Sequence, residues 1–269
     1  MAKVALTDAL RAQYTDLFNT CTIRPNRAAA VEGLINSLVA NRARYEAVGN
    51  PLGIPWHFIA VIHNMESSQS FTRHLHNGDP LSARTVQVPA GRPKTGNPPF
   101  TWEESAADAL GMRGIGAATD WSLSGTLYQL EAYNGFGYRT FHPQVLSPYL
   151  WSFSNQYTSG KYVGDGTWSD TAVSAQCGAA TLLRRMAERK LFSFADQPAP
   201  QPDAMPMVVS YATTKPTDQA VLAQAVALQT WLSSHSGIFL SPDGIAGQHT
   251  SDAYKVVTGH YLPGDPRGA

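Results

Sequence analysis

A proline-rich segment near residue 200 limits what this chain can fold into more than any other feature of its sequence. Five prolines fall between Ser193 and Asp218, at positions 198, 200, 202, 206 and 216. Proline fixes φ and lacks a backbone N–H, so a run of prolines interrupts helices and favours an extended linker. The sequence therefore predicts a first domain at 1–192, a linker at 193–216 and a small helical second domain at 217–269.

Apolar residues recur at helical spacing through most of the first domain. Helices are predicted from Thr7 onward, at 27–48, from Pro55 to about Ser68, from Thr101 onward, at 121–135 and at about 171–191. Thr101 and Glu104 have the spacing of a capping box. Residues 76–100 are rich in Gly and Pro around "RTVQV", which predicts a loop with at most a small hairpin. The expected fold class is mainly α, with this one irregular insertion.

The overall composition excludes several classes of partner. Basic and acidic side chains number 20 each, so charge does not indicate a nucleic-acid partner. No apolar run is long enough for membrane insertion, and we expect a monomer without a cofactor. Cys21 and Cys177 match no metal-ligand spacing and are interpreted as buried free thiols, although whether they pair stays open. The first residues do not resemble a secretory signal, so we expect synthesis in the cytoplasm and later release or non-classical export.

The helix predicted to end near residue 68 carries an acidic residue on its apolar face. Glu66 follows Ile59, Ile62 and His63 by seven, four and three positions, which places it on their side of the helix. Burial there would raise the pKa of the carboxyl group and keep a proton on it near neutral pH. Such a group suits the general acid of glycosidic bond cleavage, whereas a helix-end residue paired with Arg73 in water is the alternative.

Glycoside hydrolysis usually needs a second carboxylate, which activates water or stabilises positive charge on the sugar. Asp79 is the nearest downstream candidate, although its turn-forming context "HNGDP" also suits a hydrogen bond to its own backbone. Thr85, six residues further on, is predicted to hold the nucleophilic water. Glu103 and Glu104 are alternative carboxylates, but their place at a helix start favours capping roles.

Aromatic rings, which pack against the C–H faces of sugars, are concentrated downstream of Glu66. They are Trp102, Tyr133, Tyr138, Tyr149, Trp151 and Tyr157, some of which must belong to the core. Tyr133 and Tyr138 are favoured because "YNGFGY" contains two glycines that let backbone approach a ligand. Predicted substrate contacts are Tyr133, Asn134, Tyr138, His76, Arg84 and Trp102. The string His74, His76 and Asp79 lacks a third strong ligand at a familiar spacing, so no metal site is predicted.

Three motifs in this order resemble the lysozyme superfamily of peptidoglycan hydrolases. Glu66-Ser67 matches the "ES" pair of soluble lytic transglycosylases and goose-type lysozymes, and residues 132–135, "AYNG", match their cleft segment. Glu66, Asp79 and Thr85 are similar to the Glu, Asp and Thr of phage-type lysozymes. The resemblance covers about 50–140 and implies a lysozyme-like α+β glycosidase acting on peptidoglycan or a related polysaccharide. The "GLMQ"-type segment of transglycosylases is missing, so hydrolysis by an activated water, with inversion, is expected.

The second domain resembles the peptidoglycan-binding type 1 domain. The matching residues are Leu228, Gln229, Asp243, Gly244, Gly247, Thr250 and Ala253. The resemblance implies a wall-binding role for Gln229, Asp243 and Thr250, and Thr250 is also predicted to cap a helix. A binding domain tethered to a glycosidase would raise the local concentration of its substrate. The alternatives are a glycosidase of the same fold acting on chitosan, chitin or a β-glucan, and an inactive wall-binding protein.

Overall fold

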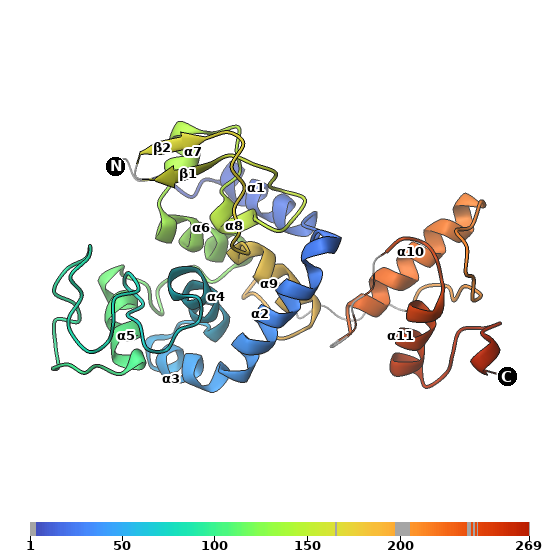
Figure 1. The fold of residues 1–269 in the computed structure, drawn as a ribbon, viewed down its shortest axis with the longest axis horizontal. Coiled ribbons are helices and arrows are strands. Elements are labelled where there is room, and N and C mark those ends of the chain that lie inside the picture. Colours follow the sequence, from blue (N-terminus) through green and yellow to red (C-terminus); the bar gives the residue numbers. More distant parts are fainter. Residues whose placement is uncertain are drawn as a thin grey trace. The chain divides into compact units, whose positions relative to one another are not determined.

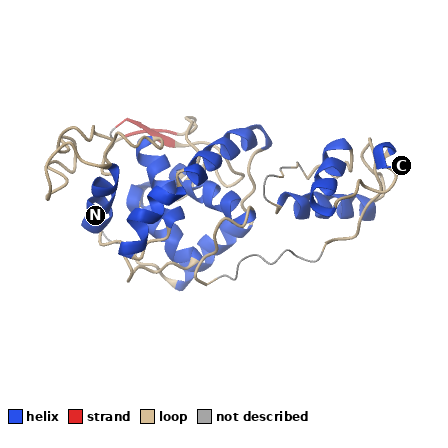
Figure 2. Cartoon of the chain, turned by 90° about the horizontal axis from the view of Figure 1, so that it is seen from below, coloured by secondary structure: helices blue, strands red, loops and turns tan. Residues whose placement is uncertain are grey.

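The computed structural model describes residues 4–164, 166–196, 205–235, 238, 240 and 242–268, and helices dominate this part of the chain (Figures 1 and 2). The predicted mainly α class is confirmed. Two compact units divide the chain: the first comprises Met1–Arg185 with Phe194–Asp196, and the second comprises Met186–Ser193 with Gln197–Ala269. Within the described residues, we find no helix whose length and apolar character would suffice to cross a membrane.

Four helices form the first part of unit 1. They are α1 (Asp8–Asn19), α2 (Ala28–Ala40), α3 (Arg42–Leu52) and α4 (Trp56–Ser67), with a 3-10 turn, η1, at Pro25–Arg27. Thr7 caps α1 as predicted, because its side chain accepts a hydrogen bond from the N–H of Leu10. The single helix predicted at 27–48 is wrong. Asn41 leaves helical geometry between α2 and α3, and its side chain donates to the Ser37 carbonyl.

Helix α3 also runs further than predicted. The sequence predicts a helix end at residue 48, but α3 continues through Pro51, which lies in its last turn, and Gly53, in the left-handed conformation, ends the helix. The next helix, α4, is buried along most of its length, with α3 and α6 packed against it (Figure 1). Gly49 allows the close approach of α3 to the start of α4, since a Cβ there would stand 2.3 Å from the Ile54 carbonyl oxygen.

A long irregular loop joins α4 to α5 (Trp102–Met112) (Figure 1). The small hairpin predicted around "RTVQV" does not form; within residues 68–101 the only strand-like pairing is an isolated bridge between Arg73 and Pro80. The capping box predicted at the start of α5 is confirmed, since Thr101 and Glu104 each accept a hydrogen bond from the other's backbone N–H. This pair fixes where the loop ends and the helix begins.

The rest of unit 1 holds four helices and a hairpin. They are α6 (Leu123–Asn134), α7 (Gly137–Phe141), α8 (Pro148–Trp151), α9 (Ala179–Glu188, whose last turn is assigned to unit 2) and the antiparallel strands β1 (Lys161–Gly164) and β2 (Thr167–Ser169). The hairpin was not predicted, because strands this short show no clear alternation. The helix predicted at 171–191 begins only at Ala179. Before it, Gly178 packs so closely on α8 that a Cβ would stand 2.3 Å from the Leu150 carbonyl oxygen.

Unit 2 is built on α10 (Gln219–Ser233) and α11 (Gln248–Thr258), followed by η2 (Pro266–Gly268). Its core contains Val209, Ala225, Leu228, Leu232, Ile238, Ala246, Ala253, Tyr254 and Leu262. The predicted linker at 193–216 is too long. Val209 is buried in this core, and the N–H of Tyr211 donates to the Pro263 carbonyl at 2.8 Å. The apolar run "MVVSY" explains this docking, and residues 197–204 of the predicted linker lie outside the described residues.

Candidate active site

Glu66 lies in the last turn of α4, on the buried side that its spacing predicted. Ile59, Ile62 and His63, which share its face, are fully buried, and Glu66 itself is partly buried. The O–H of Tyr149, in α8, donates to Glu66 Oε1 at 2.9 Å. Burial raises the pKa of Glu66, while this hydrogen bond and the positive charge of Arg113 oppose the rise. Glu66 is thus a partly buried carboxyl group with a raised pKa, not a solvated helix end.

The backbone turns sharply directly after Glu66 and Ser67. Ser68 and Gln69 both have positive φ, at 50° and 64°, a conformation that is costly for residues with a side chain. Hydrogen bonds hold this turn: Gln69 Nε2 donates to Asn64 Oδ1 at 2.9 Å, and Gln176 Nε2 donates to the Met65 carbonyl at 2.8 Å. Strain of this kind persists only where surrounding contacts enforce it, and it often marks a functional site.

Arg113 and Tyr133 both interact electrostatically with Glu66. The Arg113 guanidinium lies 3.7 Å from the centre of the Tyr133 ring, and its Nη1 donates to the Tyr133 carbonyl at 3.0 Å. Burial raises the pKa of Tyr133, and the nearby Glu66 adds to the rise. Arg113 therefore supplies a positive charge that acts on Glu66. Tyr133 is buried, and its O–H donates to the Leu75 carbonyl, so the substrate contact predicted for it is not supported.

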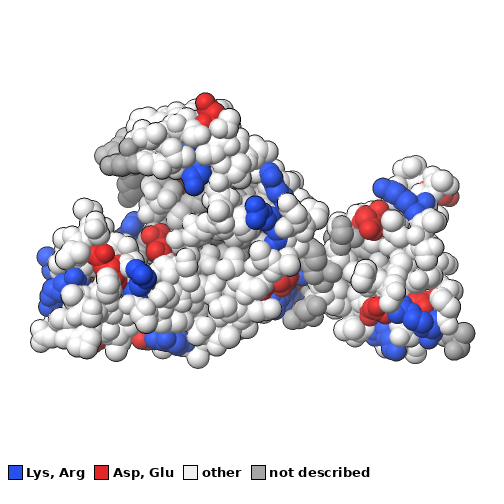
Figure 3. Space-filling view, in the orientation of Figure 1, with Lys and Arg blue, Asp and Glu red and all other residues white. Residues whose placement is uncertain are grey.

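A pocket of about 340 Å³ is lined in part by Tyr149, which hydrogen-bonds this carboxyl group. Its lining includes Asn134, Tyr138, Tyr149, Lys161, Tyr162, Ser174 and Gln176. Glu66 does not itself line the pocket, but Tyr149 binds its carboxyl group and Gln176 binds the end of its helix. Figure 3 shows the surface of unit 1 hollowed between the part that carries β1 and β2 and the part that carries α5. The structure thus brings the predicted contacts Asn134 and Tyr138 together at one pocket.

Aromatic side chains of the hairpin support one wall of this pocket. The Tyr138 ring contacts the Tyr162 ring edge-on at 5.6 Å, and Trp168 lies 5.7 Å from Tyr138. His142 stacks on Trp168 with ring centres 3.4 Å apart. These contacts fix Tyr138 and Tyr162 in place, and rings held in this way suit the apolar faces of a sugar.

Asp79 organises the loop after α4. Its Oδ2 accepts hydrogen bonds from the backbone N–H groups of Val86 and Gln87 and from the side chain of Asn77. The Gln87 N–H is the main cause that lowers the pKa of Asp79, so the group is a carboxylate at neutral pH. The loop stays near the acid, since a Cβ on Gly78 would stand 3.5 Å from the Glu66 carbonyl oxygen. Asp79 thus holds the loop through backbone seven and eight residues further on, not through the bond to its own backbone that its turn context suggested. Its Oδ1 has no hydrogen-bond partner among the described residues.

Thr85 does not fit the water-holding role predicted for it. Its hydroxyl donates its single proton to the Pro89 carbonyl at 2.5 Å and accepts a hydrogen bond from the N–H of Arg92 at 3.0 Å. The side chain is buried, with 2% of the residue exposed. The hydroxyl therefore joins two parts of the loop to each other, and it has no proton left to donate to a water.

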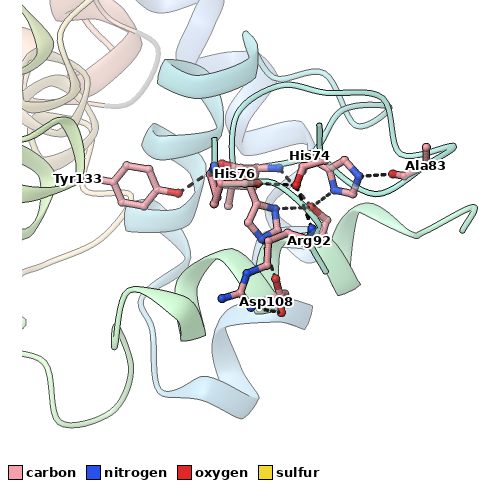
Figure 4. A network of polar contacts seen from close by, with 10 residues as sticks. His74, His76, Ala83, Arg92, Asp108 and Tyr133 are labelled. Carbon is pink, nitrogen blue, oxygen red and sulfur yellow. Dashed lines mark hydrogen bonds and ion pairs between the residues drawn. The ribbon is translucent and has the colours of Figure 1, made fainter. Parts of the chain in front are cut away.

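His76 is likewise occupied by structure rather than turned toward a substrate (Figure 4). Its Nε2 pairs with Asp108 Oδ2 at 2.8 Å, and Arg92 binds the other oxygen of Asp108 at 3.3 Å. His74 bonds to Ser105 through Nδ1 and to the Ala83 carbonyl through Nε2. Burial lowers the pKa of His76, which the Asp108 carboxylate opposes. The network fastens the loop to α5, so the predicted substrate contact by His76 is not supported.

Two further predicted contacts are also structural. Trp102 is 1% exposed and packs against Tyr45, His63 and Phe71, so it belongs to the core and its predicted sugar contact is wrong. Arg84 donates to the Gly96 carbonyl at 2.7 Å and lies over the Phe100 ring, which holds the far end of the loop.

Of the alternative carboxylates, Glu104 has the capping role that its position favoured, whereas Glu103 forms an ion pair. Glu103 pairs with Arg44 at 2.6 Å, and Glu104 belongs to the capping box. Among the described residues, no group of three or more His, Cys, Asp or Glu side chains is arranged to hold a metal ion. Cys21 and Cys177 are buried free thiols.

In unit 2 the predicted wall-binding residues form an internal cluster. Gln229 Nε2 donates to Asp243 Oδ1, the Ile245 carbonyl and Thr250 Oγ1 at 2.9–3.1 Å, and Gln229 Oε1 accepts from the Gly244 N–H. Gln229 and Thr250 are buried, and only Asp243 is exposed. Thr250 does not cap α11, whose N-cap is Gly247. Gln229 and Thr250 hold the turn before α11 rather than present their polar atoms to a ligand.

Sequence reasoning missed Arg113, Lys161, Tyr162 and Gln176 as site residues. Arg113 is the only charged residue in "ALGMRGIG", which is a weak signal that was available. The hairpin and the segment before α9 carry no such signal, since their approach to α4 depends on tertiary packing. Comparison of the chain with family profiles, with curated proteins and with solved structures found no match in any of the three.

Proposed function

We propose that this protein is a lysozyme-like glycoside hydrolase that cleaves the glycan strand of bacterial peptidoglycan. The observation that carries the proposal is the Glu66 carboxyl group, whose pKa is raised by burial and which Tyr149 links to a pocket with aromatic walls. A carboxyl group whose pKa is raised, held next to a sugar-binding pocket, is the kind of general acid that protonates a glycosidic oxygen. The pocket volume of about 340 Å³ is within the range of about 300–1,000 Å³ typical of ligand sites.

In this proposal Glu66 donates its proton to the leaving oxygen, and Asp79 stabilises the positive charge that develops on the sugar or activates the water. The lowered pKa of Asp79 favours the ionised form that either role needs. Its Oδ1 is the oxygen available for this, because Oδ2 is taken by the loop. Tyr138, Tyr162 and Asn134 contact the sugar, and unit 2 binds the wall, with Asp243 as its exposed candidate residue.

A second outcome, transglycosylation with an anhydro product, is favoured by the loop contacts of Asp79 and Thr85. Both side chains form hydrogen bonds within the loop. A reaction that uses the substrate's own hydroxyl as nucleophile needs no water held by Thr85. Only one carboxyl group, Glu66, is then required to act first as acid and then as base.

Mass spectrometry of products from purified cell wall distinguishes hydrolysis from transglycosylation. Reducing-end muropeptides support the hydrolase, anhydro ends support the transglycosylase, and free peptides reject glycan cleavage. Parallel digestion of chitosan, chitin and a β-glucan tests the choice of polymer. Binding to sacculi without release of any product would instead indicate an inactive wall-binding protein.

A further inference from the structure

A second, smaller pocket adjoins the first one. Its volume is about 70 Å³, and Ser174 lines both pockets, so the two are neighbours on one surface. This volume is far below the range of about 300–1,000 Å³ typical of ligand sites. The second pocket therefore fits one group of a larger ligand that is seated in the first.

The charge of the second pocket comes from two arginines. The Arg24 side chain is held by the backbone of the pocket wall, because its Nε donates to the Ser154 carbonyl at 2.9 Å and its Nη2 donates to the Tyr157 carbonyl. The Arg27 guanidinium lies 4.6 Å from the centre of the Phe153 ring, and the Arg27 side chain has no hydrogen bond or ion pair with any described residue. Its guanidinium donors thus remain available for an anion, and their planar fork suits a carboxylate.

The ring beneath Arg27 is held in an unusual conformation. Phe153 has φ 72°, a region that residues with side chains rarely adopt, and the residue is 8% exposed. Its carbonyl accepts the N–H of Arg24 at 3.0 Å, and Ser152 and Ser154 anchor the segment on both sides. Strained backbone of this kind is often found at ligand sites. It places the Phe153 ring as a platform that orients Arg27 over the pocket.

We propose that the second pocket is an anion subsite, in which Arg27 binds a carboxylate on the peptide substituents of a glycan strand held in the first pocket. This inference rests on the proposed function. Charge supports it, because Lys161 lines the first pocket and no acidic side chain of the described residues lines either pocket. Peptide stems carry free carboxylates next to the sugar, so their attachment point would lie near Ser174.

The test compares kcat/KM on two substrates: intact peptidoglycan, and glycan strands from which an amidase has removed the peptides. We expect Arg27→Gln to lower the ratio of kcat/KM for intact over stripped strands about fivefold, the size of an exposed ion pair. Arg27→Lys keeps the charge and should retain most of the ratio. Because one enzyme preparation serves both substrates, any loss of folded protein cancels in the ratio.

Arg42→Gln is the matched control. Arg42 also lies over a ring, 4.8 Å from the centre of Trp56, but it lines neither pocket. Its ratio should equal that of the wild type. The inference is overturned if Arg27→Gln leaves the ratio unchanged, raises it, or lowers it no more than Arg42→Gln. A wild type that cleaves neither substrate overturns the proposed function itself and this inference with it.

Discussion

Replacing Tyr149 with Phe changes one hydrogen bond to the candidate acid and leaves the ring in the pocket. The Tyr149 O–H donates to Glu66 Oε1 at 2.9 Å, which stabilises the ionised form of Glu66. A hydrogen bond to a charged group contributes about 1.5–3 kcal/mol, and one pH unit corresponds to about 1.4 kcal/mol. Without this bond Glu66 keeps its proton to higher pH. We therefore expect the alkaline limb of kcat/KM to move upward by about one pH unit or more.

The assay is the release of reducing ends from purified peptidoglycan, measured across the pH range for wild type, Tyr149→Phe and Tyr162→Phe. Tyr162 also lines the pocket but makes no hydrogen bond to Glu66, so its variant should leave the position of the limb unchanged, whatever happens to KM. An alkaline limb that stays in place in Tyr149→Phe, or moves to lower pH, would refute the assignment of Glu66 as the titrating acid.

Three further predictions concern stability. Thr85→Val removes two hydrogen bonds inside the loop and should lower the free energy of unfolding of the variant by about 1–3 kcal/mol in denaturant melts; lost activity with unchanged stability would instead restore the water-holding role. Gln229→Ala removes four hydrogen bonds in unit 2 and should cost about 3 kcal/mol or more, with thermal unfolding as the readout, and a small effect there would contradict the structural role of the cluster. Burial lowers the pKa of His57 to about 3 and that of His63 to about 4. Between about pH 6.5 and these pKa values, the histidines take up protons in the unfolded chain but not in the folded one. The free energy of unfolding is therefore highest above pH 6.5 and falls as the pH is lowered, by about 2 kcal/mol per histidine at pH 5. Unfolding free energies that stay flat from pH 7 to pH 5 would contradict this.

Local signals in the sequence were sufficient for the position of the candidate acid. The seven-, four- and three-residue spacing from Ile59, Ile62 and His63 placed Glu66 correctly, because one helix repeats its faces regardless of its surroundings. The capping box at Thr101 was equally local. Where prediction failed within helices, as at Asn41, one side chain competed with helical geometry by binding the backbone four residues earlier.

The rest of the site depends on contacts between distant segments. Tyr149 reaches Glu66 from 83 residues away, and Gln176 reaches Met65 from 111 residues away, so no spacing rule could pair them. Residue type alone also misled. Trp102 and Thr85 are types that serve equally in cores and in sites, and burial decided their role here. The two glycines beside Asn134 did indicate the pocket, since backbone at Gly135 and Gly137 lines it.

Removal of the Glu66 proton donor tests the central claim most directly. Glu66→Gln keeps the shape of the side chain and a hydrogen-bond acceptor for Tyr149, but it cannot transfer a proton. Glu103→Gln, at the start of α5, is the control for loss of a carboxylate that serves structure through an ion pair with Arg44. We predict that release of reducing ends from peptidoglycan falls about 10²- to 10⁴-fold in Glu66→Gln and stays within a few-fold of wild type in Glu103→Gln. Wild-type turnover by Glu66→Gln would contradict the account.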